Sequence, residues 1–130
     1  MRCQKLFEKG CIGGVEIRNR VAMTAMGNGL ASWDGEVSLE LIRFYEDRAR
    51  GGCGLIFTEF TRMDETSGAC NPNQLCIATR KHIRSTERVR CHGARIFVQL
   101  HHGGREAPSA LNDGKQPMAP SAILNSAWRS

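Results

Sequence analysis

Residues 38–60, SLELIRFYEDRARGGCGLIFTEF, join a helix pattern directly to a strand pattern. Ser38 belongs to the residue types that cap helix N-termini, and Glu40 adds a negative charge in the first turn. Apolar residues then recur every four positions on one helix face: Leu41, Tyr45 and Ala49. Glycines at positions 51 and 52 end the helix, and the apolar run over 54–60 is typical of a strand buried on both faces. The segment therefore predicts a helix followed by a central β-strand.

The same alternation continues on both sides of this segment. Residues 21–26 form an apolar run without alternation and predict another buried strand before the helix. Residues 82–92 predict a second helix with a meagre apolar stripe, and residues 95–100 predict a third strand. Strands that alternate with helices pair in parallel through right-handed crossovers, so we expect an α/β fold.

Two further regions complete the outline. Residues 6–18 alternate loosely around Gly13-Gly14 and predict a short hairpin. Residues 61–80 are polar and show neither a helical nor a strand periodicity, which predicts a long loop of the kind that is often functional. Three strands and two helices leave at least one strand edge open and one sheet face thinly covered. We therefore expect the chain to be the beginning of a larger fold.

The composition excludes several classes of protein. With 41% hydrophobic and 24% charged residues, the chain is neither disordered nor of low complexity. No stretch approaches the roughly 18 consecutive apolar residues of a membrane span, and the first residues lack the apolar core of a signal peptide. A cytoplasmic protein is therefore expected. The six cysteines have neither a secretory context nor paired C-x-x-C spacing, which favours reduced structural thiols.

The net charge of +5 is concentrated in residues 80–95, which hold six basic residues and one acidic residue. Clustered Arg and Lys could neutralise nucleic-acid phosphates. However, a single aromatic residue, Phe97, lies nearby, and the charges are spread around the predicted helix instead of forming one stripe. A solvated outer face is favoured, so we expect neither a nucleic-acid nor a membrane partner. The alternative is a small basic binding module that uses Arg84, Arg88 and Arg90.

Ligands of parallel α/β folds gather at the carboxyl ends of the strands, which are here residues 24–29, 59–61 and 99–105. These ends combine small residues, a hydroxyl, an amide, two histidines and an arginine, which suits a flat heterocycle with mixed donors and acceptors. Gln99 could be functional or structural, because an amide at the end of an apolar run is expected to be buried and needs partners there. Thr24 could equally be a buried β-branched residue bonded to the backbone.

Two other groups favour structural interpretations. Adjacent His101 and His102 point to opposite faces of an extended segment, and no third ligand follows at metal spacing, so no metal site is expected. Glu59 could act as a general base, but nothing near it in the sequence would tune it for that role. An ion pair between Glu59 and Arg62 or Arg105 is the favoured interpretation.

Four blocks of sequence, in the right order, resemble the Old Yellow Enzyme family of FMN-dependent oxidoreductases. They are residues 19–26 (NRVAMTAM), 44–56 (FYEDRARGGCGLI), 94–105 (ARIFVQLHHGGR) and 119–123 (APSAI). The resemblance runs from Leu6 to about Ile123, nearly the whole chain. Within the family, the chain is most similar to the branch that contains 2,4-dienoyl-CoA reductases, enoate reductases and bile-acid-inducible NADH:flavin oxidoreductases.

The resemblance implies a TIM (β/α)8 barrel with FMN across the carboxyl ends of its strands. Residues 1–130 would be the N-terminal part of this FMN-binding domain, with a hairpin that closes the base and the first three β/α units. Six residues match family positions that contact the flavin: Thr24, Ala25, Met26, Gly27, Phe60 and Gln99. Gln99 would bond the pyrimidine edge, and the Thr24 hydroxyl would donate toward the O4/N5 edge. His102 and Arg105 match the H-x-G-R loop of the family, as part of an active-site loop.

Three of these positions depart from the family pattern. Family members often have Pro at the position of Ala25 and Cys or Thr at that of Gly27. The second change removes a side chain that would otherwise tune the flavin potential. The position of Phe60 is usually small, so the bulk of this ring conflicts with a close flavin contact there.

The resemblance also implies a reaction of the ene-reductase type. NADH or NADPH would reduce FMN at N5, and the hydride would pass to an activated alkene such as an enoyl thioester or an enone. The substrate-orienting His pair, the proton donor and the phosphate site of the family come from later strands, beyond Ser130, so no catalytic residue is assigned. The 130-residue chain alone is expected neither to bind FMN tightly nor to turn over. An iron–sulfur cluster and FAD in a longer parent protein, and a non-catalytic α/β remnant, remain open alternatives.

Overall fold

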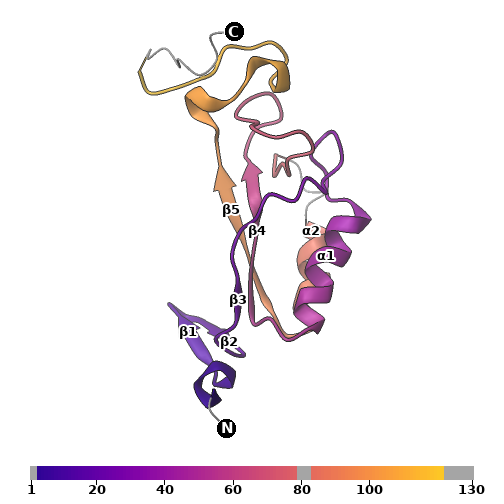
Figure 1. The fold of residues 1–130 in the computed structure, drawn as a ribbon, viewed down its shortest axis with the longest axis vertical. Helices are drawn as coiled ribbons and strands as arrows, with labels where there is room; N and C mark the ends of the chain where they lie inside the picture. The colour runs from indigo at the N-terminus through magenta and orange to yellow at the C-terminus, as the bar shows by residue number, and fades with distance from the viewer. Residues whose placement is uncertain (1–2, 79–82, 122–130) are drawn as a thin grey trace.

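The computed structural model describes residues 3–78 and 83–121. Its elements are η1 (Gln4–Phe7), β1 (Gly10–Ile12), β2 (Val15–Ile17), β3 (Ala22–Met23), α1 (Leu39–Arg50), β4 (Leu55–Arg62), α2 (Ile83–Arg90), β5 (Arg95–His101), η3 (Gly104–Glu106) and η4 (Ser109–Leu111). Strands β1 and β2 form an antiparallel hairpin, and β3, β4 and β5 form a parallel sheet in that order (Figure 1). The predicted α/β order of hairpin, strand, helix, strand, helix and strand is confirmed.

Helix α1 forms where local sequence rules predict it. The hydroxyl oxygen of Ser38 accepts a hydrogen bond from the Leu41 backbone N–H at 3.0 Å, and the hydroxyl donates to the carbonyl of Leu30. Satisfying one of the free N–H groups of the first turn stabilises a helix by about 1 kcal/mol. The predicted apolar face is buried, because Leu41, Tyr45 and Ala49 are each at most 1% exposed.

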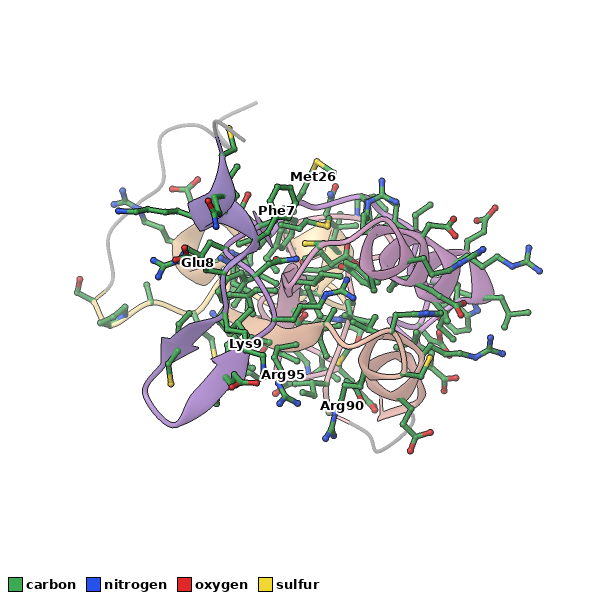
Figure 2. The ribbon with its side chains drawn as sticks, turned by 90° about the horizontal axis from the view of Figure 1, so that it is seen from below. Phe7, Glu8, Lys9, Met26, Arg90 and Arg95 are labelled. Carbon is green, nitrogen blue, oxygen red and sulfur yellow. The ribbon has the colours of Figure 1, made fainter. Side chains whose placement is uncertain are left out.

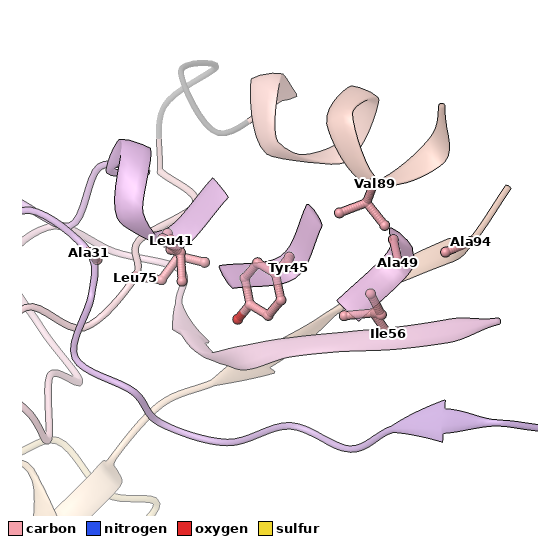
Figure 3. Close-up of a cluster of buried hydrophobic side chains, with 8 residues drawn as sticks. All are labelled: Ala31, Leu41, Tyr45, Ala49, Ile56, Leu75, Val89 and Ala94. Carbon is pink, nitrogen blue, oxygen red and sulfur yellow. The ribbon is translucent and has the colours of Figure 1, made fainter. Parts of the chain in front are cut away.

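Both helices cover the same face of the sheet. A cluster of buried side chains fills the space between them and β4 (Figure 3): Ala31, Leu41, Tyr45, Ala49, Ile56, Leu75, Val89 and Ala94. Val89 supplies the contact from α2, which explains why the apolar stripe of this helix is thin. Residues 79–82 at the predicted start of the second helix lie outside the described residues.

The other face of the sheet has no helix among the described residues (Figure 1). Because Met23, Ile56 and Ile96 pack toward the helices, strand alternation directs their neighbours to this open face. Phe57 and Phe97 meet there with ring centroids 5.8 Å apart. Strands β3 and β5 are the two edges of the sheet. The sequence predicts such an open strand edge and a thinly covered face.

Two local predictions about β structure are wrong. The strand expected over residues 21–26 is limited to Ala22–Met23, and Val21 and Met26 are 38% and 53% exposed. Since β3 is an edge strand with one covered face, an apolar run there does not become buried on both faces. The hairpin begins at Gly10 instead of residue 6, because residues 4–7 form the 3-10 turn η1.

The segment after the hairpin ties together the amino ends of the strands. The guanidinium of Arg18 donates to the carbonyls of Ala49 at 2.6 Å, Cys53 at 2.8 Å and His92. Ala49 lies in the last turn of α1, and His92 follows the end of α2. One cation therefore neutralises the negative ends of both helix dipoles and fixes the start of β4.

The basic segment lies on the outer surface where it is described. Arg90 and Arg95 are exposed and are labelled in Figure 2. Arg88 lies 3.6 Å from Glu46, and His92 Nε2 lies 3.2 Å from the same carboxylate. The hydrogen bond with His92, followed by the charge of Arg88, lowers the pKa of Glu46. These contacts join α1 to α2.

Candidate functional site

The carboxyl ends of the three parallel strands meet around one aromatic ring. The ring of Phe60, in β4, covers Gly27, which follows β3, and a Cβ atom added at Gly27 would lie 2.2 Å from Phe60 Cε1. On the other side, the Phe60 ring contacts His101, the last residue of β5, with ring centroids 5.1 Å apart and an interplanar angle of 60°. The structure therefore brings together residues from all three predicted strand ends.

Two polar candidates flank this ring on the open face. Phe60 pairs with Gln99 in the sheet register, and alternation from Met23 directs Thr24 to the same face. Both residues are exposed, and within the described part of the chain neither side chain forms a hydrogen bond. The predicted burial of Gln99 is wrong, because β5 is an edge strand whose open face has no described cover. The alternative for Thr24, a buried hydroxyl bonded to the backbone, is also wrong.

Glu59 is a buried carboxylate that holds two loops. It is 2% exposed, its Oε2 accepts from the Asn28 N–H at 3.0 Å, and its Oε1 accepts from the Leu75 N–H at 3.3 Å. The predicted ion pair with Arg62 or Arg105 does not form. Arg62 lies three positions along the strand and donates instead to the carbonyls of Glu65 at 2.7 Å and Asp34 at 3.4 Å. Glu59 therefore fixes the backbone beside Gly27.

Tyr45 supports the same strand end from α1. Its hydroxyl oxygen accepts the Glu59 backbone N–H at 2.8 Å, and the side chain is 1% exposed. Burial, opposed by the hydrogen bond from Glu59, raises the pKa of Tyr45 to about 12. The folded state therefore holds this phenol neutral above its ordinary pKa of about 10.

This pKa predicts a loss of stability at alkaline pH. The contribution of the neutral phenol is complete below pH 10 and disappears as the pH rises toward 12, because ionisation then favours the unfolded chain. A difference between about 10 and about 12 corresponds to roughly 3 kcal/mol. Tyr45→Phe should lose about 1 kcal/mol at pH 8 but should lack the additional alkaline decline. Urea unfolding of both proteins at pH 8 and pH 11 measures the difference, and equal declines would contradict the assignment.

The loop over residues 63–78 is ordered by side chains that the sequence did not single out. Gln74 is 4% exposed, accepts the Cys70 N–H at 2.8 Å and donates to the Phe60 carbonyl at 3.3 Å. Asn112 is 5% exposed, accepts the Ala69 N–H at 2.9 Å and donates to the Ala69 carbonyl at 3.0 Å. No local pattern marks either residue, because each fastens segments that are distant in sequence.

His101 and His102 point to different partners, as predicted for neighbours on an extended segment. Nδ1 of His101 lies 3.4 Å from Gln74 Nε2, and partial burial lowers the pKa of His101. Nδ1 of His102 accepts from the Gly104 N–H at 3.0 Å, which leaves its Nε2–H to face Ser67 Oγ at 3.4 Å. Arg105 is exposed and lies 3.3 Å from Glu106. His102 therefore anchors the loop that follows β5.

Taken together, the strand ends form a surface that suits a flat heterocycle. The ring of Phe60 fills the space that a side chain at position 27 would occupy. A ring laid across these strand ends would meet an apolar floor at Gly27 and Phe60, with the amide of Gln99 and the hydroxyl of Thr24 on either side. Ala25 is small enough for a ligand to approach the backbone.

Comparisons with known proteins agree with this chemistry. A family model described as the NADH:flavin oxidoreductase / NADH oxidase family matches residues 5–128. An NADH oxidase of Thermoanaerobacter brockii is 42% identical over 122 residues, which are 91% of this chain and 19% of that protein. A cinnamate reductase of Clostridium sporogenes is 38% identical over 130 residues, with 91% and 19% coverage. The chain thus spans about a fifth of the length of these curated relatives.

Solved structures show the same fold. The old yellow enzyme homologue from Zymomonas mobilis superposes with a TM-score of 0.80 and 31% identity, over 92% of this chain and 34% of that one. Morphinone reductase in complex with tetrahydroNAD superposes with a TM-score of 0.78 and 29% identity, over 91% of this chain and 33% of that one. Among the described residues, no helix is long and apolar enough to span a membrane.

Proposed function

Because the chain belongs to the NADH:flavin oxidoreductase / NADH oxidase family, we propose that residues 1–130 are the N-terminal part of an FMN-binding TIM-barrel domain. In this proposal, the hairpin and the three parallel strands are the base and the first three β/α units of the barrel. The coverage supports it, since the match spans 92% of this chain and 34% of a solved homologue. The complete protein would be an NAD(P)H-dependent oxidoreductase of the ene-reductase type.

The observation that carries this proposal is the pair of polar side chains at the strand ends that form no hydrogen bond with any described residue. Gln99 offers one donor group and one acceptor to the pyrimidine edge of a flavin, and the Thr24 hydroxyl offers a hydrogen bond toward the O4/N5 edge. Ala25 and Gly27 allow close approach of the backbone, and exposed Met26 adds apolar surface. Bound FMN would supply two-electron transfer between a nicotinamide and an activated C=C bond.

The substrate and the partners follow from the same proposal. One relative is named as a cinnamate reductase, which supports an activated alkene, such as an enone or an enoyl thioester, as the substrate class. Relatives named as an NADH oxidase and an NADPH dehydrogenase support a nicotinamide reductant of either kind. We further propose a cytoplasmic enzyme with a small-molecule substrate and no nucleic-acid partner. An iron–sulfur cluster and FAD would belong to other parts of a longer protein.

FMN binding by the full-length protein tests the proposal. The purified protein should carry FMN, which is released on denaturation, and Gln99→Leu should weaken FMN binding at least about tenfold, since its hydrogen bonds are worth about 1–2 kcal/mol. Gln4→Leu, at the opposite end of the molecule, is the matched control. A protein that neither carries FMN nor binds added FMN, or equal affinities for the two variants, would contradict the proposal.

Two further expectations have assays of their own. The 130-residue chain alone should show no tight FMN binding, because the phosphate site of such barrels follows strands 7 and 8. If the chain were instead a small basic binding module, the protein would be retained on nucleic acid at low salt, and replacing Arg84, Arg88 and Arg90 would abolish this retention. We expect no such retention.

A further inference from the structure

Gly27 and Phe60 compete for one volume at the centre of the strand ends. A Cβ atom at position 27 would lie 2.2 Å from Cε1, 2.9 Å from Cζ and 3.3 Å from Cδ1 of the Phe60 ring. The first two distances are too short for real contacts, so no side chain fits at position 27 while the ring stays in place.

Described contacts hold the backbones of the two positions next to each other. The Phe60 carbonyl accepts a hydrogen bond from buried Gln74, and the ring is in edge contact with His101. On the other side, Asn28, the residue after Gly27, donates its N–H to the buried carboxylate of Glu59. Because Glu59 directly precedes Phe60, this bond holds the backbone beside Gly27 against β4, and a side chain at position 27 would have to displace the Phe60 ring.

We propose that Phe60, seated on Gly27, is a positioning residue that forms an apolar floor for the flavin, and that positions 27 and 60 can change size only together. This inference rests on the proposed function. The ring excludes any hydroxyl or thiol from position 27, so the cofactor meets an aromatic surface where a polar donor could otherwise stand. Apolar surroundings oppose the addition of negative charge, so exchanging the ring for a hydroxyl raises the flavin midpoint potential.

A double-mutant cycle in the full-length FMN-loaded protein tests the coupling. Gly27→Thr alone should lower FMN affinity at least tenfold, and Phe60→Ala alone should lower it several-fold by removing the floor. The double variant Gly27→Thr/Phe60→Ala should recover to within about threefold of the native affinity and should have a more positive midpoint potential. Gly14→Thr in the hairpin, where nothing lies within 4 Å of the added Cβ, is the matched control.

The outcomes separate the two proposals. If the native protein binds FMN but the effects of the single changes multiply in the double variant, the coupling is wrong while the proposed function stands. An unchanged potential in the double variant overturns the apolar-floor assignment. If the native protein binds no FMN, both proposals fail. Thermal unfolding of all four proteins identifies a variant that is simply unfolded, and recovery of the melting temperature in the double variant then tests the shared volume directly.

Discussion

Replacement of Arg18 by methionine is expected to lower the free energy of unfolding by about 2–3 kcal/mol, because hydrogen bonds from a charged group contribute about 1.5–3 kcal/mol and these three are partly buried. The guanidinium donates to the carbonyls of Ala49, Cys53 and His92, and these acceptors come from three separate segments. Methionine keeps most of the apolar stem but leaves all three carbonyls without this donor. It also removes the positive charge from the C-terminal ends of α1 and α2.

Urea unfolding of the full-length protein measures this effect, with Arg20→Met as the control. Arg20 lies two residues along the chain and is exposed, so its replacement should change stability by less than about 0.5 kcal/mol. Arg18→Lys keeps the charge, but an ammonium group lacks the planar guanidinium that reaches all three acceptors. We therefore expect an intermediate loss of unfolding free energy. An Arg18→Met protein as stable as Arg20→Met would show that the helix ends do not depend on this contact.

Glu59→Leu is expected to cost about 2–4 kcal/mol, because it leaves the buried N–H groups of Asn28 and Leu75 without acceptors. Glu59→Gln keeps the shape but has one acceptor oxygen in place of two, so about half of that loss is expected. The loop after β3 would no longer be fixed, and FMN affinity should fall with stability.

Glu16→Leu is the control for this change. Glu16 forms an exposed ion pair with Lys9 at 2.9 Å, and such pairs contribute little to stability. In chemical unfolding and FMN titration, the stability and the FMN affinity of Glu16→Leu should therefore be close to those of the native protein. If Glu59→Leu matched it in both measurements, the carboxylate would have no role in holding the strand ends.

The parts of the fold that follow local rules were predictable from the sequence. The cap at Ser38 and the apolar spacing of Leu41, Tyr45 and Ala49 depend on residues within one or two turns, and helix α1 has these bounds. Strands β4 and β5 also lie where apolar runs predicted them. By contrast, the burial of a strand depends on which other segments cover it, and this cannot be predicted from the strand's own apolar residues.

The two glutamines illustrate the limit for the site. The position of Gln99 at the end of an apolar run predicts a buried amide, yet the residue is exposed on an edge strand. Gln74, by contrast, is a buried amide in a polar loop, and its partners at Cys70 and Phe60 are brought near by folding. Similarly, the contact between Gly27 and the Phe60 ring joins residues that are 33 positions apart, and no local pattern predicts it.

The unequal edges of the sheet have a consequence for biosynthesis. Strand β3 offers two residues at one edge, whereas β5 offers seven at the other. On the ribosome, β5 is complete before any residue that follows it, and a long edge with unpaired backbone groups can pair with a neighbouring nascent chain. Self-association of newly made chains should therefore begin at residues 95–101.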